Sequence, residues 1–376
     1  MVALAPRTAH LTPGCRMNRI LVIVPNWFGE TLFATPFLRA LRQQRPQAFI
    51  AAMGWPQCRE VLRHNPDVND WLDYDEHGAH RSLVGKWRLV RVLRARHYDT
   101  AFLLRKSLSR ALLLVMAGIP RRVGFANAKS GWLLTHRLPA PRQSAGQAGV
   151  PPAAGPRHKA STYLPLLEAV GLLVLPGPYT YTVSDEERQA AREQLSSRSV
   201  CDGRPLVILH PGANWPHKRW APERFAALGD QLIEGPRAHI AITGGPDDVP
   251  LAQAMQRAMR QPAVVLAGTT TLRQLGALLE QAQLVVSNDT GVLHIAAALR
   301  RPIVALYGPT SPALTGPLGD PARTITVHHP DCCPSIPCYE PDRPAHPGMN
   351  AITVDEVFAA ASRLLERVAT GKVAGP

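Results

Sequence analysis

The sequence lacks any continuous apolar stretch of about 18 residues, the length that a membrane-spanning helix needs. Residues 1–16 have no apolar core of the kind found in secretory signals, and we expect them to form a disordered extension. Cysteine is scarce, with six residues spread unevenly over a chain of 376, which does not make a disulfide framework. These absences favour a protein of the reducing cytoplasm.

Acidic residues are few relative to basic ones: 28 Asp and Glu stand against 42 Lys and Arg, and the net charge is +14. Such an excess points to an anionic partner, which could be nucleic acid, anionic lipid or a phosphorylated glycan. The sequence has no nucleic-acid recognition motif and no platform of alternating aromatic and basic residues, so we expect no nucleic-acid partner. An arginine-rich surface without a dedicated partner is the alternative.

Short apolar runs alternate with helical patterns along both halves of the chain. Runs that are apolar throughout are typical of parallel strands whose sheet is covered by helices on both faces. The alternation predicts an α/β protein with two doubly wound, Rossmann-like domains that face a central cleft. The expected strands are 20–24, 48–53, 68–72 and 100–104 in the first half, and 206–209, 240–243, 264–266, 284–287 and 303–307 in the second.

Composition and helix signals divide the chain into units. The expected units are an N-terminal domain at 17–178 with a flexible loop at 139–157, a C-terminal domain at 179–352, and a final helix and tail at 353–376. The loop is rich in Pro, Ala and Gly and cannot build a core. Ser184–Glu187 and Thr353–Glu356 have the pattern of capping boxes, which open helices.

The stretch SNDTGVLHIAAALRRPIVALYGP places a tight turn and a helix start after a buried strand. In an open parallel sheet, ligands bind at this kind of corner. The N–H groups of Thr290 and Gly291 suit a phosphate, whereas the Asp289 carboxylate would repel phosphate and suits sugar hydroxyls. His294 lies one turn further, where the helix dipole favours a neutral ring, although a packing role is the alternative. A phosphate and a polyol at one corner indicate a nucleotide sugar.

The segment HPGANWPHKRW follows another buried strand of the second half. Gly212 lets the backbone approach a ligand, and the amides of Ala213 and Asn214 can point at phosphate oxygens. Lys218 supplies a positive charge that would offset the negative charge developing on a diphosphate leaving group. Arg219 could serve instead, and an ordinary loop with a surface Lys-Arg pair is the alternative.

Glu30 lies in the short loop that joins the first strand to its helix. A carboxylate there can take a proton from an acceptor hydroxyl as the hydroxyl attacks an activated sugar. The alternative is that Glu30 only stabilises the positive end of the helix. Cations of the first half would form the anion site of the acceptor. The tentative acceptor-binding residues are Arg81, Lys86, Arg121, Arg122 and Lys129.

The segment Cys332–Cys338, with His346 beyond it, raises the question of a metal site. Its spacing is not the paired CxxC pattern of structural zinc. We expect a proline-rich lid with reduced cysteines, no metal and no cofactor.

Four segments resemble those of the ADP-heptose:lipopolysaccharide heptosyltransferases, the glycosyltransferase family 9 group, which has a GT-B fold. They are ILVIVPNWFGETLFATPFLRALR, GFANAKSGWLLTHRLP, HPGANWPHKRWAPERFAAL and SNDTGVLHIAAALRRPIVALYGPTSPALTGP. The resemblance implies an inverting, metal-independent transfer of heptose from ADP-L-glycero-D-manno-heptose to the inner core of lipopolysaccharide. It also implies that Lys218 meets the donor phosphates. The donor-site residues that it implies besides Lys218 are Asp289, Thr290, Gly291 and His294.

The partners expected from the resemblance are ADP-heptose and an anionic lipid A-core acceptor, at the cytoplasmic face of the inner membrane. The family's loop usually reads Gly-Asp, while this chain has Gly29-Glu30, which moves the carboxylate by about an ångström in a site where such shifts are costly. The alternatives are a different sugar or surface-glycan acceptor, an epimerase, and a non-catalytic nucleotide-sugar-binding protein.

Overall fold

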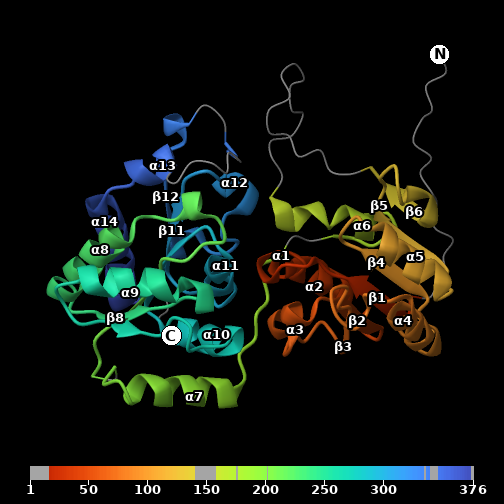
Figure 1. Ribbon diagram of the computed structural model, residues 1–376, viewed down its shortest axis with the longest axis horizontal. Coiled ribbons are helices and arrows are strands. Elements are labelled where there is room, and N and C mark those ends of the chain that lie inside the picture. The colour runs from red at the N-terminus through yellow and green to blue at the C-terminus, as the bar shows by residue number, and fades with distance from the viewer. Residues whose placement is uncertain are drawn as a thin grey trace.

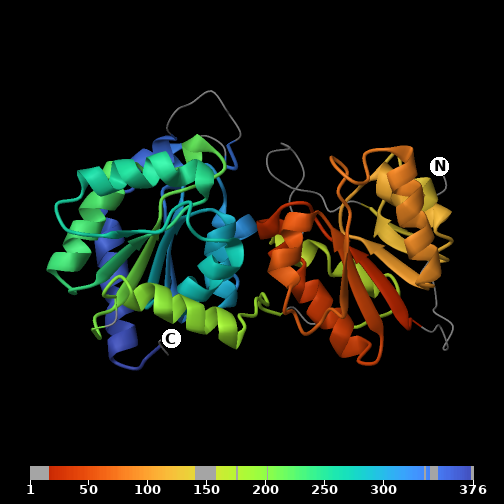
Figure 2. The ribbon, with the colours of Figure 1, turned by 60° about the horizontal axis from the view of Figure 1, so that its bottom comes forward.

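The computed structural model describes residues 17–139, 158–174, 177–200, 202–333, 336–338 and 346–373. The predicted extension at 1–16 and all but the first residue of the predicted flexible loop lie outside the described residues. Two six-stranded sheets, with every strand pair parallel, form two lobes that lie side by side (Figures 1 and 2). We call the lobe that holds strands β1–β6 the N-lobe and the lobe that holds β7–β12 the C-lobe.

The N-lobe sheet has the order β3-β2-β1-β4-β5-β6, so the chain winds outward from β1 in both directions. Its strands are β1 Arg19–Ile23, β2 Phe49–Gly54, β3 Asp70–Asp73, β4 Thr100–Leu103, β5 Arg121–Phe125 and β6 His136–Leu138. Its helices are α1 Phe28–Phe33, α2 Thr35–Gln44, α3 Pro56–Leu62, α4 Leu83–Ala95, α5 Leu108–Met116 and α6 Pro165–Glu168, with a 3-10 turn, η1, at Gly131–Leu133. Helices α4 and α5 cover one face of this sheet, and α1–α3 and α6 cover the other.

The C-lobe sheet has the order β12-β11-β10-β7-β8-β9. Its strands are β7 Leu206–His210, β8 His239–Ile242, β9 Val264–Val265, β10 Leu284–Asn288, β11 Ile303–Tyr307 and β12 Thr324–His328. Its helices are α7 Asp185–Ser196, α8 Pro222–Glu234, α9 Val249–Ala258, α10 Leu272–Gln281, α11 Gly291–Ala298, α12 Pro312–Thr315, α13 Pro347–Ala351 and α14 Val354–Ala369. Both predicted capping boxes are confirmed, at the starts of α7 and α14. Helix α14 packs on α8 and on the C-lobe sheet.

Three strands were not predicted from the sequence: β5, β6 and β12. Each lacks the continuous apolar run that identified the others, because β5 begins with two arginines, β6 has only three residues, and β12 is half-buried along its length. The short or partly exposed strands β6 and β12 are edge strands, which need less apolar character than central ones. None of the helices in the described part of the chain is both long and apolar enough to cross a bilayer.

The lobes touch where the carboxyl-terminal edges of their sheets meet. Gly29 and Gly291 lie so close that a Cβ on Gly29 would be 3.2 Å from the Gly291 Cα atom. Behind this contact, Arg273 of α10 donates a hydrogen bond to the Glu60 carbonyl of α3 at 3.1 Å. One continuous cluster of buried apolar side chains includes residues from both lobes. The loop after β1 is therefore held against the start of α11.

Candidate active site

Asp289 follows β10 directly and is almost fully buried. Its Oδ2 atom accepts hydrogen bonds from Lys218 Nζ and from Thr310 Oγ1, both at 2.7 Å. Burial alone would raise the pKa of this carboxyl group, but the Lys218 ammonium, together with His294 and the hydrogen bonds from Lys218 and Thr310, outweighs burial and holds the pKa below its ordinary value. Asp289 is therefore a buried carboxylate that stays ionised because a lysine faces it.

Lys218 ends the short 3-10 turn at Pro216–Lys218, in the loop after β7. Strands β7 and β10 are neighbours in the sheet, so the loops that leave their carboxyl ends lie side by side. Asn288 joins these loops: its Oδ1 accepts from the Trp220 N–H at 3.1 Å, and its Nδ2 donates to the Pro211 carbonyl at 2.8 Å. Sequence reasoning missed Asn288 and Thr310, although Asn288 stands directly before the predicted Asp289.

Arg219, the alternative cation of this loop, is used differently. Its Nε donates to the Ala213 carbonyl at 2.9 Å, and its Nη2 lies 3.7 Å from Asp248 Oδ1. Lys218 is thus the cation that reaches Asp289. The Asp248 carboxylate also fills the space beside the Gly212 Cα, where a Cβ would not fit, and Asn214 is exposed. The predicted roles of Gly212 in close backbone approach and of the Ala213 and Asn214 amides in phosphate binding stay predictions.

His294 lies in α11 and is buried between two aromatic rings. The ring centroids of Phe33 and Tyr179 are 4.7 Å and 5.8 Å from that of His294. The His294 Nε2 atom is 4.0 Å from Asp289 Oδ1. Burial lowers the pKa of His294 to about 4, so the ring is neutral near pH 7. The predicted neutrality is confirmed, but its largest cause is loss of solvent rather than the helix dipole.

The buried ring predicts a loss of stability in acid. Because the folded-state pKa of His294 is about 4 against an ordinary 6.5, only the unfolded chain takes up a proton as pH falls through that window. The free energy of unfolding should fall by about 3 kcal/mol from this group between the two pKa values. Burial lowers the pKa of His210 to about 4 in the same way, and this group adds to the fall of the unfolding free energy in acid.

Urea unfolding at a series of pH values measures this loss. The variant His294→Asn should show a shallower fall of the unfolding free energy than the parent chain, whereas His77→Gln, at an exposed ring, should keep the parent's slope. Equal slopes for the parent and His294→Asn would contradict the assignment.

Glu30 lies in the first turn of α1 and is half-buried. Within the described residues its carboxylate has no hydrogen bond and no ion pair. Burial raises the pKa of the Tyr163 hydroxyl and of the Cys58 thiol, and the negative charge of Glu30 adds to both shifts. The contact between Gly29 and Gly291 places the backbone next to Glu30 against the start of α11, whose N-cap is Thr290.

The fit of Gly291 against the N-lobe leads to a second prediction. A Cβ on Gly291 would overlap the ring of Phe28, so Gly291→Ala must displace the loop that carries Glu30. Because catalytic groups tolerate little displacement, we expect kcat/KM to fall about a hundredfold. Adding Phe28→Ala should restore much of the loss, because it removes the overlapping ring. Gly118→Ala is the matched control, since a Cβ there meets no atom within 4 Å, although its positive φ adds a local strain. A double variant as slow as Gly291→Ala would rule out this overlap as the cause.

The five predicted acceptor cations fall into two groups. Arg81 and Lys86 flank the start of α4, and Lys129 follows β5, so all three lie toward the carboxyl-terminal edge of the sheet, where Glu30 also lies. Arg121 and Arg122 begin β5 and lie at the opposite edge. Arg122 donates to the carbonyls of Leu133 and Ile119 at 2.7 and 2.6 Å. This placement argues against contact between Arg121 or Arg122 and a substrate, and gives them a structural role.

Arg110 is a buried cation that sequence reasoning missed. It lies in the first turns of α5, is 1% exposed, and its Nη2 donates to Asn26 Oδ1 at 2.6 Å. Asn26 stands just before the loop that carries Glu30, so Arg110 braces that loop. The positive charge of Arg105 lowers the pKa of the Tyr163 hydroxyl, which burial and the charge of Glu30 raise. The signal for Arg110 was a basic residue on the apolar face of α5.

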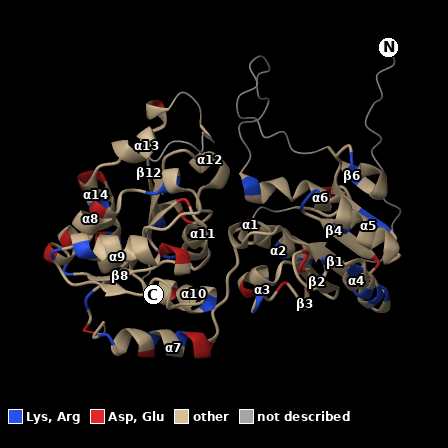
Figure 3. Cartoon of the chain, in the orientation of Figure 1, with Lys and Arg blue, Asp and Glu red and all other residues tan. Residues whose placement is uncertain are grey.

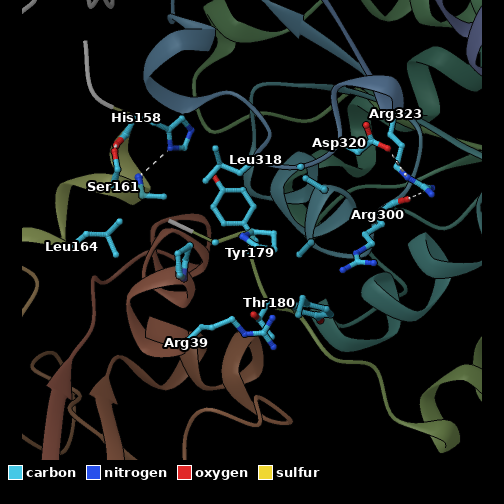
Figure 4. Close-up of a pocket in the computed structure, with 18 residues that line it drawn as sticks. Arg39, His158, Ser161, Leu164, Tyr179, Thr180, Arg300, Leu318, Asp320 and Arg323 are labelled. Carbon is cyan, nitrogen blue, oxygen red and sulfur yellow. Dashed lines mark hydrogen bonds and ion pairs between the residues drawn. The ribbon is translucent and has the colours of Figure 1, made fainter. Parts of the chain in front are cut away.

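A pocket of about 700 Å³ lies between the lobes beside His294 (Figure 4). Tyr179 and His158 line it, and the His158 ring is 5.7 Å from that of Phe33, which in turn contacts His294. None of the predicted site residues lines this pocket. Tyr179, whose ring packs against His294, is shared between this pocket and the aromatic cluster around His294.

Three side chains that can bind a metal ion lie close together near the loop that follows β11. Ligand atoms of Cys333, Cys338 and His346 lie within 4.8 Å of one another, and the Cys338 N–H donates to the Pro309 carbonyl at 2.7 Å. Two thiolates and an imidazole suit a cation such as Zn²⁺. However, His346 Nδ1 accepts a hydrogen bond from the Gly348 N–H at 3.1 Å, so metal binding would have to break that bond. The sequence spacing did not predict this cluster, and the expected absence of a metal stays a prediction.

Comparison with known proteins places this chain in a family. The model of glycosyltransferase family 9 (heptosyltransferase) matches residues 86–341. Lipopolysaccharide heptosyltransferase 2 of Escherichia coli K12 is 33% identical over 323 residues, which cover 82% of this chain and 88% of that protein.

Two solved structures have the same architecture. The E. coli ADP-heptose lps heptosyltransferase II matches with a TM-score of 0.76 and 28% identity, covering 93% of this chain and 99% of that one. The family 9 glycosyl transferase of Veillonella parvula matches with a TM-score of 0.80 and 25% identity, covering 93% and 97%. The predicted fold class, an α/β protein of GT-B type with two Rossmann-like lobes, is confirmed.

Proposed function

The chain belongs to glycosyltransferase family 9, the heptosyltransferases, and on that premise we propose that it moves a heptose from ADP-L-glycero-D-manno-heptose to the inner core of lipopolysaccharide. The observation that carries the proposal is the joining of Asp289, Lys218 and the Glu30 loop at one contact between the lobes. The identity to a lipopolysaccharide heptosyltransferase over most of both chains supports the sugar and the acceptor.

The reaction that we propose is an inverting displacement. The acceptor hydroxyl attacks the anomeric carbon of the heptose from the face opposite the diphosphate, and Glu30 takes the hydroxyl proton. A bond forms between the acceptor oxygen and that carbon, while the bond from the carbon to the diphosphate oxygen breaks. The electron pair leaves with ADP. Because attack and departure are on opposite faces, the anomeric configuration inverts.

Lys218 and Asp289 share the donor side of the reaction. The Lys218 ammonium offsets the negative charge that grows on the diphosphate as it leaves, so the step needs no metal ion for that purpose. Asp289 holds Lys218 in place and accepts hydrogen bonds from sugar hydroxyls. The amides of Thr290 and Gly291, at the start of α11, bind a phosphate, and neutral His294 supports the same pocket.

The proposed partners follow from this chemistry. The acceptor is an anionic, lipid-linked core glycan, so the enzyme works as a peripheral protein on the cytoplasmic face of the inner membrane. Arg81, Lys86 and Lys129 are the predicted cations that lie on the correct edge of the N-lobe sheet to meet its phosphates.

An assay of ADP release with purified acceptors tests the proposal. Kdo-lipid A and its heptosylated form are offered separately, and mass spectrometry of the products identifies the added sugar. A mass gain of one heptose supports the proposal; a different sugar or glycan favours another family 9 activity. Conversion of the donor without acceptor, followed by NMR, would indicate an epimerase. Donor binding with no turnover on any core acceptor would overturn the proposal.

A further inference from the structure

Exposed apolar side chains are concentrated on the outer face of the N-lobe. Of the twelve large hydrophobic side chains that are exposed in the described residues, nine lie between positions 83 and 132. They belong to α4, α5 and η1, and we call the surface that they form the α4–α5 face. These nine residues are Leu83, Val84, Trp87, Val92, Leu108, Leu112, Val115, Met116 and Trp132.

The spacing of these residues makes a continuous stripe rather than scattered contacts. On α5, Leu108, Leu112 and Val115 recur at helical spacing on the side opposite the buried Leu114. Leu112 is 45% exposed, so packing inside the protein does not require an apolar residue at this position. An exposed apolar stripe of this length on a helix marks an interaction surface.

Helices α4 and α5 and the turn η1 form one surface. Arg94 near the end of α4 donates a hydrogen bond from Nε to the Met116 carbonyl at the end of α5, at 2.8 Å. Helix α5 contacts η1, which carries Trp132 at 71% exposure. The two exposed tryptophans, Trp87 on α4 and Trp132 on η1, thus lie on elements that α5 joins.

Cations alternate with the apolar residues of α4, and acids are absent from both helices. The α4 sequence LVGKWRLVRVLRA contains Lys and Arg but no Asp or Glu, whereas the one cation of the α5 sequence LSRALLLVM, Arg110, is buried. Figure 3 shows Lys and Arg gathered on α4, at the end of the N-lobe far from the C-lobe. The Arg91 guanidinium lies 5.0 Å from the centroid of the Trp87 ring.

We propose that the α4–α5 face docks on an anionic lipid bilayer. Tryptophan and aliphatic side chains enter the boundary between headgroups and acyl chains, while Arg and Lys meet anionic headgroups, which is the chemistry of an interfacial helix. Charge decides between a bilayer and a second copy of the chain, because two copies joined through this face would bring their cations together. The face begins at the starts of α4 and α5, toward the edge of the sheet that also carries Glu30.

The inference rests on the proposed function, which requires a lipid-linked acceptor, but it is tested without any substrate. The full chain is mixed with vesicles of phosphatidylcholine containing a quarter of phosphatidylglycerol, and with vesicles of phosphatidylcholine alone, and bound protein is sedimented. We expect binding to the anionic vesicles, weakened by salt and much reduced on the neutral ones.

Paired variants locate the surface. Arg88→Glu and Arg91→Glu should each weaken vesicle binding at least about fivefold, the factor for removing one cation near an anionic membrane. The double variant Leu112→Ser and Val115→Ser should weaken binding while leaving the charge unchanged. Leu173→Ser and Arg257→Glu, at exposed positions elsewhere, are the matched controls and should bind like the parent. Thermal unfolding checks that each variant is folded.

Several outcomes would overturn the proposal: no binding to anionic vesicles, equal binding by surface and control variants, or a dimer in light scattering that Leu112→Ser abolishes. The last result would assign the face to a second copy. Vesicle binding without heptosyl transfer would support the membrane-docking surface and contradict only the proposed function. If the chain transferred heptose to a water-soluble truncated acceptor but did not bind vesicles, the proposed function would stand and the membrane-docking proposal would be overturned.

Discussion

Replacing Lys218 with methionine is expected to lower kcat/KM for heptosyl transfer about a hundred- to a thousandfold. Methionine keeps the length of the side chain and removes its charge, so the leaving diphosphate loses the cation that faces it. The measurement is steady-state ADP release at several donor concentrations. The loss should include kcat, since the charge on the diphosphate grows as the bond breaks.

The Lys218→Met variant is also expected to be less stable, and a second substitution separates the loss of stability from the loss of activity. Without Lys218, the Asp289 carboxylate is left buried and unpaired, which costs on the order of 3 kcal/mol. Adding Asp289→Asn removes that charge and should restore the melting temperature without restoring activity. Arg219→Met is the matched control, because Arg219 points to Ala213 rather than to Asp289. If Arg219→Met slowed transfer as much as Lys218→Met, the assignment of the cation would be wrong.

The variant Glu30→Gln is expected to lower kcat about a hundred- to ten-thousandfold while the affinity for ADP stays near that of the parent. Glutamine has the size of glutamate but cannot take the acceptor's proton. Glu30→Asp keeps a base and withdraws it by about an ångström, so it should retain more activity than Glu30→Gln.

Glu60→Gln changes another carboxylate of the N-lobe, on α3, and serves as the control for Glu30→Gln. Its rate should match that of the parent. A Glu30→Gln enzyme that transfers heptose at the parental rate would remove the general base from the mechanism and leave Glu30 as a helix-end residue. Calorimetric titration with ADP shows whether donor binding is intact.

Much of the fold could be predicted because its central strands are buried on both faces. Segments such as ILVIV and LVVS are apolar throughout, and only a parallel sheet covered by helices requires that. Lys218 and Asp289, both expected at the donor site, lie in the loops that follow two such strands, and the structure brings their side chains within 2.7 Å. Strand order explains this success, since β7 and β10 are neighbours.

The features that the sequence did not predict depend on contacts between distant segments. The only local sign of Arg110 is its position on the apolar face of α5, and its partner, Asn26, lies 84 positions away. Arg121 and Arg122 were grouped with the acceptor cations because strand β5 was not recognised, and the direction of that strand places them at the far edge. The clustering of Cys333, Cys338 and His346 likewise depends on the path of the chain and not on spacing.

The apolar cluster shared by the two lobes has a kinetic consequence. Parting the lobes would separate the edge-on contact between the Phe33 and His294 rings and expose apolar surface to water, which costs free energy. A donor whose entry requires the lobes to part must wait for that opening. Its capture is therefore gated by how often the lobes part, and the apparent affinity is reduced by the small fraction of open molecules.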